Sequence, residues 1–280
     1  MTAASIPAAT PVSLFDSAYA CLTSADPDEK CRLTARIAEC WRAGALTLAA
    51  ASTPYPIDTP GRPPRPQLVP PRALPRRRLG SREGRAALLH ALAHIEFNAI
   101  NLAWDAVYRF RELPGRFYGD WIRVATEEAY HFRLLRDRLR ALGYDYGAFD
   151  AHDGLWEMAR ATAHDPLVRM ALVPRVLEAR GLDVTPGIMD KLRNAGDDAS
   201  VSVLEIILRD EIGHVEIGTR WFRFLCEQRG LAPVETFERL LLRYMKGRVK
   251  GPFHREARLS AGFSEPELEN LARLAEGCSK

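Results

Sequence analysis

Two short stretches of the sequence carry the same pairing of a carboxylate and an imidazole three residues apart. Glu128 and His131 form one Glu-x-x-His pair, and Glu211 and His214 form the other. In a helix, three residues turn the chain by about 300°, so the two side chains of a pair lie on one face, one turn apart. Such a pair can bind a metal ion from a single helix, and the sequence therefore predicts two metal-binding helices.

The residues around these pairs place the carboxylates and imidazoles on helix faces that should pack in a core. Apolar residues at helical spacing surround the first pair at Trp121, Val124, Leu135 and Leu139, and the second at Leu204, Leu208, Val215 and Phe222. Glu96 and Glu178 interrupt two further apolar stripes in the same way. A charged group in a core is costly unless it is paired or bound to a metal. One dinuclear metal site would satisfy all six residues: Glu96, Glu128, His131, Glu178, Glu211 and His214.

An acid directly precedes the glutamate of each pair. Glu127 and Asp210 are rotated by about 100° around their helices from the neighbouring ligand. From there each can accept the second N–H of the histidine on the facing helix, and we expect Asp210 to pair with His131. Alternatively, either acid is an ordinary surface residue. His94, two residues before Glu96, is interpreted as a residue that supports the ligands or as a core residue.

Length and composition favour one large domain with attachments. The chain has 280 residues and a mass of 31.3 kDa, with 47% hydrophobic and 27% charged residues and a net charge of +3. This charge is too small to imply a polyanionic partner by itself. No apolar run approaches the roughly 18 residues of a membrane span, so no membrane partner is expected. The five cysteines form no CxxC motif, which predicts reduced thiols and a cytoplasmic location.

The first part of the chain divides into a helical hairpin and a proline-rich strap. Residues 1–50 are predicted to contain two helices, one capped by Ser13 and one beginning at Asp26-Pro27. Residues 51–81 form the strap, since nine of the 19 prolines fall between positions 51 and 82. Eight arginines and two acids lie between positions 53 and 85. These arginines either pair with acids of the main domain or contact phosphates, so an RNA partner of the 62–85 stretch stays a weaker alternative.

The main domain, 82–230, is predicted to contain four long helices. They cover residues 82–112, 116–142, 166–180 and 197–229, and a short helix from Gly154 lies in the connection between the second and the third. Pro174 should kink or bulge the third helix, which is expected to end at Gly181 before another helix opens at Thr185-Pro186. Gly213 and Gly218 weaken the fourth helix, either to leave room for a small molecule or to relieve crowding. Residues 231–280 are a helical extension. The fold class is therefore all-α.

The order of the ligands resembles that of the ferritin-like carboxylate-bridged di-iron proteins. In that family a lone glutamate on the first and third helices alternates with Glu-x-x-His on the second and fourth. Residues 170–184 are also similar to a bacterial ferritin-like family that is catalogued as of unknown function. The resemblance implies a four-helix bundle in which Glu128 and Glu211 bridge two metal ions. The terminal ligands would then be Glu96, Glu178 and the two histidines.

Carboxylates and imidazoles without any thiolate suit two iron ions, with manganese or a mixed pair as the alternative. Together with the resemblance, this predicts an oxidoreductase that activates dioxygen to oxidise or hydroxylate a small molecule, with an electron donor as a further partner. Other hypotheses are hydroxylation of a tRNA base, and oxidation and handling of iron. The sequence does not identify the substrate.

Overall fold

The computed structural model describes residues 12–49, 53–75, 78–245 and 249–277, and almost all of their regular structure is helical. The helices are α1 (Leu14–Thr23), α2 (Pro27–Arg42), α3 (Arg82–Arg109), α4 (Gly115–Ala141), α5 (Gly154–Ala161), α6 (Pro166–Leu172), α7 (Ala179–Asn194), α8 (Asp198–Gln228), α9 (Pro233–Met245), α10 (Arg255–Ser260) and α11 (Glu265–Gly277). One 3-10 turn, η1 (Pro71–Ala73), lies in the strap, and one π-helical turn, η2 (Val173–Glu178), joins α6 to α7. The predicted all-α class is confirmed.

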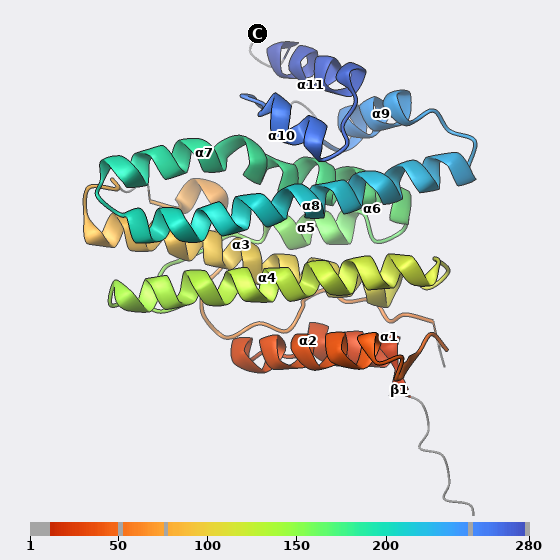
Figure 1. The fold of residues 1–280 in the computed structure, drawn as a ribbon, viewed down its shortest axis with the longest axis horizontal. Helices are drawn as coiled ribbons and strands as arrows, with labels where there is room; N and C mark the ends of the chain where they lie inside the picture. The colour runs from red at the N-terminus through yellow and green to blue at the C-terminus, as the bar shows by residue number, and fades with distance from the viewer. Residues whose placement is uncertain (1–11, 50–52, 76–77, 246–248, 278–280) are drawn as a thin grey trace, which may run out of the picture.

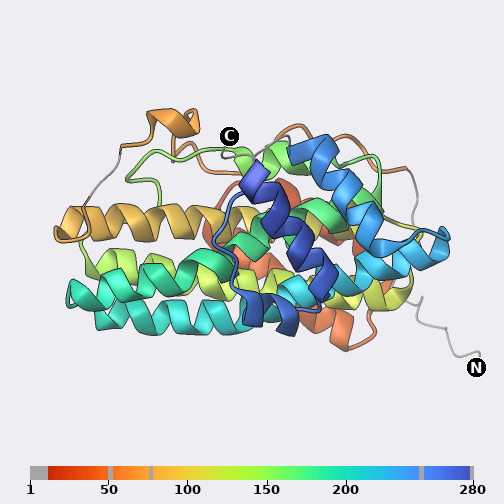
Figure 2. The same ribbon diagram turned by 90° about the horizontal axis from the view of Figure 1, so that it is seen from above.

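Four long rods make up the centre of the molecule, namely α3, α4, α8 and the continuous segment α6–η2–α7 (Figure 1). Neighbouring rods pack as α3 on α4, α4 on α8, and α8 on α7. The N-terminal helices α1 and α2 lie on the outer side of α3 and α4, whereas α9, α10 and α11 cover the opposite side of the molecule (Figure 1). In the view from above, α11 lies across the long helices (Figure 2). Within the described residues, no helix is long and apolar enough to cross a membrane.

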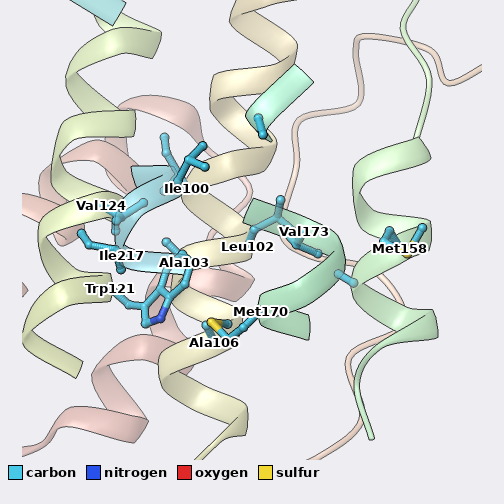
Figure 3. Packing of buried hydrophobic residues seen from close by; sticks show 14 of the residues in the cluster. Ile100, Leu102, Ala103, Ala106, Trp121, Val124, Met158, Met170, Val173 and Ile217 are labelled. Carbon is cyan, nitrogen blue, oxygen red and sulfur yellow. The ribbon is translucent and has the colours of Figure 1, made fainter. Parts of the chain in front are cut away.

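The hydrophobic core lies where these rods meet (Figure 3). The middle of α3 is buried almost all round, because it packs against α4, α1 and α5. Figure 3 shows side chains of α3 meeting those of α4, α5, α6, η2 and α8, and the labelled ones are Ile100, Leu102, Ala103, Ala106, Trp121, Val124, Met158, Met170, Val173 and Ile217. A carboxylate on these faces is therefore removed from water.

The third rod differs from the sequence prediction. It does not end at Gly181, and no new helix begins at Thr185-Pro186, because α7 runs through both positions to Asn194. Gly and Pro weaken a helix interior by about 1 and about 3 kcal/mol relative to Ala. Packing of α7 along α8 keeps the segment helical despite these residues.

The predicted distortion at Pro174 is present and takes the form of the π-helical turn η2. Proline has no N–H for the regular hydrogen-bond ladder, so the helix widens there. Gly218 of α8 lies directly against this turn. A Cβ atom at Gly218 would lie 2.3 Å from the Cβ and Cγ atoms of Pro174. Of the two interpretations of Gly218, the structure favours relief of crowding.

The N-terminal hairpin forms as the capping residues predict. The side chain of Ser13 accepts a hydrogen bond from the N–H of Asp16, and that of Asp26 accepts one from the N–H of Glu29. Two short strands, β1 (Val12–Ser13) and β2 (Leu46–Thr47), pair in parallel and were not anticipated. Lys30 was also missed: it is fully buried, and its ammonium donates to the carbonyls of Cys21 and Leu22 and to Asn101.

The strap lies over the main domain. Arg62 Nη1 is 3.2 Å from Asp153 Oδ1, and Leu68 forms a parallel bridge with Ala151. Arg85 of the basic stretch already belongs to α3, and its Nε is 3.3 Å from Asp197 Oδ2. Arg76 and Arg77 fall outside the described residues. The contacts of Arg62 and Leu68 agree with the interpretation of the strap as a segment that packs on the domain.

Candidate metal centre

The six predicted ligands come together at the middle of the four rods. Glu96 comes from α3, Glu178 is the last residue of η2, and α4 and α8 each supply one Glu-x-x-His pair. All six side chains are buried, and both histidines are completely inaccessible to solvent. We call these six residues the Glu/His cluster.

Two groups of three ligand atoms share one glutamate. Glu96, Glu128 and His131 form the first group, and Glu128, Glu211 and His214 form the second, with ligand atoms within 4.8 Å of one another in each. Glu128 lies between the two histidines, because its Oε1 is 3.0 Å from Nδ1 of His214 and its Oε2 is 3.5 Å from Nδ1 of His131. Glu128 is therefore the residue that the two groups share.

The other carboxylates lie to either side of this shared residue. Glu96 Oε2 is 3.4 Å from Nδ1 of His131, and Glu211 Oε2 is 3.2 Å from Nδ1 of His214. Glu178 belongs to neither group of three, although it lines the same cavity as Glu211 and the charge of Glu211 acts on it. The geometry thus distinguishes Glu128, which reaches both histidines, from Glu211, which contacts one.

Each imidazole contacts, through its Nε2, an acid on the facing helix. His131 Nε2 is 3.2 Å from Asp210 Oδ2, and His214 Nε2 is 2.8 Å from Glu127 Oε2. The contact between Asp210 and His131 is the one expected from the sequence. An Nε2–H that donates to a carboxylate leaves the Nδ1 lone pair of the same ring free for a metal. Both rings therefore present Nδ1 to the centre of the cluster.

His94 lies in a different polar group. Its Nδ1 is 2.8 Å from the hydroxyl of Tyr146, and its Nε2 is 3.1 Å from the carbonyl of His152. Two residues along a helix correspond to a rotation of about 200°, so His94 and Glu96 point in nearly opposite directions. The interpretation of His94 as a core residue fits this position, and the interpretation as support for the ligands does not.

Burial and mutual repulsion dominate the electrostatics of the carboxylates. Burial raises the pKa of Glu96 well above its usual value, and the neighbouring charge of Glu128 adds to this effect. Burial likewise raises the pKa of Glu178 and of Glu211. Four carboxylates in one dry site cannot all be charged unless positive charge is brought among them.

The two histidines supply that charge when they are protonated. Burial lowers the pKa of His131, but the adjacent Glu128 and Glu96 outweigh this and raise it to about 11. For His214 burial is likewise outweighed, chiefly by Glu128 and Glu127, so its pKa is raised well above the usual value. Burial opposes the charge of Glu128, yet hydrogen bonding to Glu96 and the charge of His214 keep its pKa well below normal. The raised pKa values of both histidines show that the carboxylates between the two rings favour positive charge at this place.

Buried atoms without partners show that the cluster fits metal ions. Among the described residues, Oε2 of Glu128, Nδ1 of His131 and Oε2 of Glu178 are buried and have no hydrogen-bond partner. An unsatisfied buried polar atom costs about 1–3 kcal/mol, and more when it is charged. Oxygen and imidazole ligands without sulfur suit iron or manganese. The residues present therefore fit a pair of such ions.

A cavity of about 130 Å³ adjoins the cluster, and all four glutamates line it. We call it the glutamate cavity. Its other walls come from α3, α5, η2, α7 and α8, so it lies between α3 on one side and α7 and α8 on the other. Sequence analysis did not find this cavity, because its apolar lining residues are indistinguishable from core residues in the sequence.

A second feature that sequence analysis missed lies behind Glu178. Arg175 of η2 is fully buried, its Nη2 is 2.5 Å from Oε1 of Glu267, and its guanidinium lies within 4.5 Å of the ring centroids of Phe222, Phe237 and Phe263. The C-terminal extension thus encloses the side chain three residues before Glu178. A lone arginine in an apolar stretch was the available signal in the sequence.

Comparison with known proteins identifies the family of the chain. The family model described as "Protein of unknown function (DUF455)" matches residues 23–269. A protein of Haemophilus influenzae described as an uncharacterized protein is 48% identical over 258 residues, which cover 89% of this chain and 90% of that protein. No solved structure matches significantly. The chain belongs to the DUF455 family, and the whole Glu/His cluster lies within the matched region.

Proposed function

We propose that this member of the DUF455 family is a non-haem di-iron, or iron–manganese, oxidoreductase with a ferritin-like four-helix bundle, and that it uses dioxygen to oxidise or hydroxylate a small molecule. The observation that carries this proposal is the pair of Glu/His groups that share Glu128 next to an apolar cavity. Storage of iron needs no such cavity, whereas oxidation of an organic molecule needs a dry place for the molecule beside the metal ions.

The ligands would divide between two ions. Glu96 and His131 would hold one ion, Glu211 and His214 the other, and Glu128 would contact both. Glu178, whose buried Oε2 has no partner among the described residues, would complete the second side. A reduced pair of ions would supply the electrons for reduction of dioxygen, which protein side chains alone do not provide.

The chain itself would supply orientation, charge balance and exclusion of water. Asp210 and Glu127 would fix both imidazoles with Nδ1 inward, and Arg209 and Arg123 on the surface would keep these acids charged. Hydroxylation places one oxygen atom in the substrate and the other in water, so two electrons and two protons have to come from an external donor. We therefore expect an electron donor as a partner.

Metal analysis of anaerobically purified protein tests this proposal. We expect about two iron or manganese ions per chain, and an optical spectrum that changes when the iron-loaded protein meets oxygen. Glu128→Ala should lose both ions or nearly so, because both groups use this residue. Glu205→Ala is the matched control, since Glu205 is an exposed carboxylate on the same helix as Glu211.

Two results would contradict the proposal. Full metal content in Glu128→Ala would show that the ions bind elsewhere. Continued uptake of iron far beyond two ions per chain in the presence of oxygen would indicate iron storage instead.

A further inference from the structure

The walls of the glutamate cavity are aliphatic. Apart from the four glutamates, Arg180, Thr185 and Gly181, its lining consists of Leu92, Ile95, Ala99, Leu102, Leu155, Leu177, Val184, Leu204, Ile207 and Leu208. No aromatic ring is among these lining residues. A planar ring such as a nucleobase is usually bound by stacking on aromatic side chains and by hydrogen bonds at its edge. This cavity offers neither arrangement and suits a flexible hydrocarbon chain.

The size of the cavity limits the length of such a chain. A volume of about 130 Å³ provides room for four or five groups of roughly 30 Å³ each, which is the volume of one molecule in liquid water, and a methylene group is similar in size. Ile95 lines the cavity and is 42% exposed, so the cavity lies close to solvent on this side of α3.

Gly181 keeps the cavity open next to the cluster. A Cβ atom at this position would lie 3.7 Å from Cγ of Glu211, in ordinary contact, so alanine is sterically allowed there. Alanine would also strengthen helix α7 by about 1 kcal/mol. A larger side chain would project from α7 into the space beside Glu211. The backbone conformation does not require glycine at position 181, so the lack of a side chain there is explained by the space that it leaves in the cavity.

Positive charge lies at the rim of the cavity. Arg180 is the one cationic residue of the lining, and its side chain is 41% exposed. Its Nη1 donates to the carbonyls of Lys250 and Pro252, and the group lies 3.6 Å from Asp183. Asp183 is already bound through both oxygens by Arg258, at 2.9 and 2.8 Å. Two guanidinium groups therefore share one carboxylate, which leaves net positive charge beside the entrance.

We propose that the substrate is an aliphatic monocarboxylate of about six carbons, with its chain in the glutamate cavity and its carboxylate at Arg180. This inference rests on the proposed function only in calling the ligand a substrate. The chain end would lie beside the four glutamates, where the metal ions would be held, and the charged end would stay at the solvent-exposed rim. The arrangement separates the anionic head from the carboxylates of the cluster.

Calorimetric titration of manganese-loaded protein with sodium hexanoate tests this proposal without any turnover. We expect saturable binding of one hexanoate per chain, and hexanol should bind at the same place. Gly181→Leu should abolish measurable binding of both compounds, because the new side chain fills the cavity. The matched control is Gly187→Leu on the same helix, where no heavy atom lies within 4 Å of the added Cβ; it should bind as the wild type does.

The Arg180→Gln variant tests the contact with the carboxylate separately from the contacts with the aliphatic chain. It should weaken hexanoate binding on the order of tenfold, as expected for loss of one hydrogen-bonded charge, and leave hexanol binding unchanged. Unchanged hexanoate affinity in Gly181→Leu would overturn the proposal, and so would tighter binding of adenosine than of hexanoate.

The result of the binding titration can be distinguished from the result of the metal analysis that tests the proposed function. A protein that binds two metal ions and reacts with oxygen but does not bind hexanoate would disprove the substrate class alone. Saturable binding of hexanoate to protein that retains no metal would disprove the metal enzyme alone.

Discussion

Two glycines of α8 are expected to respond in opposite directions to the same substitution. In Gly218→Ala the new methyl group would lie 2.3 Å from two carbons of Pro174, whereas carbon atoms in contact are usually about 3.5–4.0 Å apart. The proline ring is rigid and lies in η2, so relief requires a backbone shift of more than about 1 Å. In Gly213→Ala the nearest atom is Nη2 of Arg123 at 3.7 Å, an ordinary contact at the end of a flexible side chain.

The magnitudes follow from two opposing contributions. Alanine in place of glycine stabilises a helix interior by about 1 kcal/mol. Overpacking of a core costs about 1–3 kcal/mol, and the severe overlap at Pro174 places Gly218→Ala near the upper value. We expect Gly213→Ala to gain about 1 kcal/mol and Gly218→Ala to lose about 2 kcal/mol, a difference of about 3 kcal/mol between the two variants.

Urea unfolding followed by circular dichroism at fixed pH measures both free energies. Similar m values in the two variants would show that the denatured state is unchanged. Because Pro174 lies four residues before Glu178, Gly218→Ala should also lower metal affinity, which metal titration detects independently of stability. Equal stability of the two variants would refute the argument, since helix propensity alone predicts the same gain at both positions.

Three other substitutions have definite expected outcomes. Asp210→Asn should weaken metal binding by about tenfold to a hundredfold with little loss of stability, measured by competition with a chelator; wild-type affinity would return Asp210 to the role of a surface acid. Arg175→Leu should cost about 3 kcal/mol, because it removes the nearest cation from the buried Glu267 and leaves only the longer contact to Arg223. It should also reduce metal content; full metal content in the folded variant would show that this contact does not position Glu178. Burial lowers the pKa of Lys30 to about 8. Between about pH 8 and the ordinary lysine value of about 10.5, the unfolded state binds a proton at Lys30 and the folded state does not. The free energy of unfolding of the wild type therefore rises with pH in this range. Lys30→Met should lose this rise, and urea unfolding near pH 7 and pH 9.5 tests it; identical pH dependence of the two proteins would contradict the burial of a charged lysine.

Much of the fold and of the candidate site could be predicted because carboxylates in apolar stripes are costly. Glu96, Glu128 and Glu211 stand out at core positions of long helices, and the structure buries all of them in one place. Helix starts at Ser13 and Asp26 were legible from their capping chemistry. In each of these cases the signal depends on a few neighbouring residues, so sequence analysis can find it.

Other features depend on partners far away in the sequence. The continuity of α7 through Gly181 and Pro186 results from packing on α8, which local propensity does not include. His94 was associated with Glu96 by proximity along the helix, whereas its hydrogen bonds go to Tyr146 and His152 in a later loop. The cavity is likewise a property of six elements, α3, α4, α5, η2, α7 and α8. Aliphatic residues that line a cavity and those that fill a core have the same composition.

The position of Glu178 follows from a chain of such distant contacts. Pro174 prevents regular helix, Gly218 gives the widened turn η2 the space it needs, and Arg175 holds the same turn in an aromatic and acidic pocket of the C-terminal extension. Further along the chain come Leu177, which lines the cavity, Glu178 of the cluster, and Arg180 at the rim. A shift of η2 would therefore move a ligand and the entrance together. The helices α9 and α11 contribute no residue to the Glu/His cluster, yet Phe237 and Glu267 contact Arg175 in the turn that ends at Glu178, so we expect changes in these helices to reach one of its carboxylates.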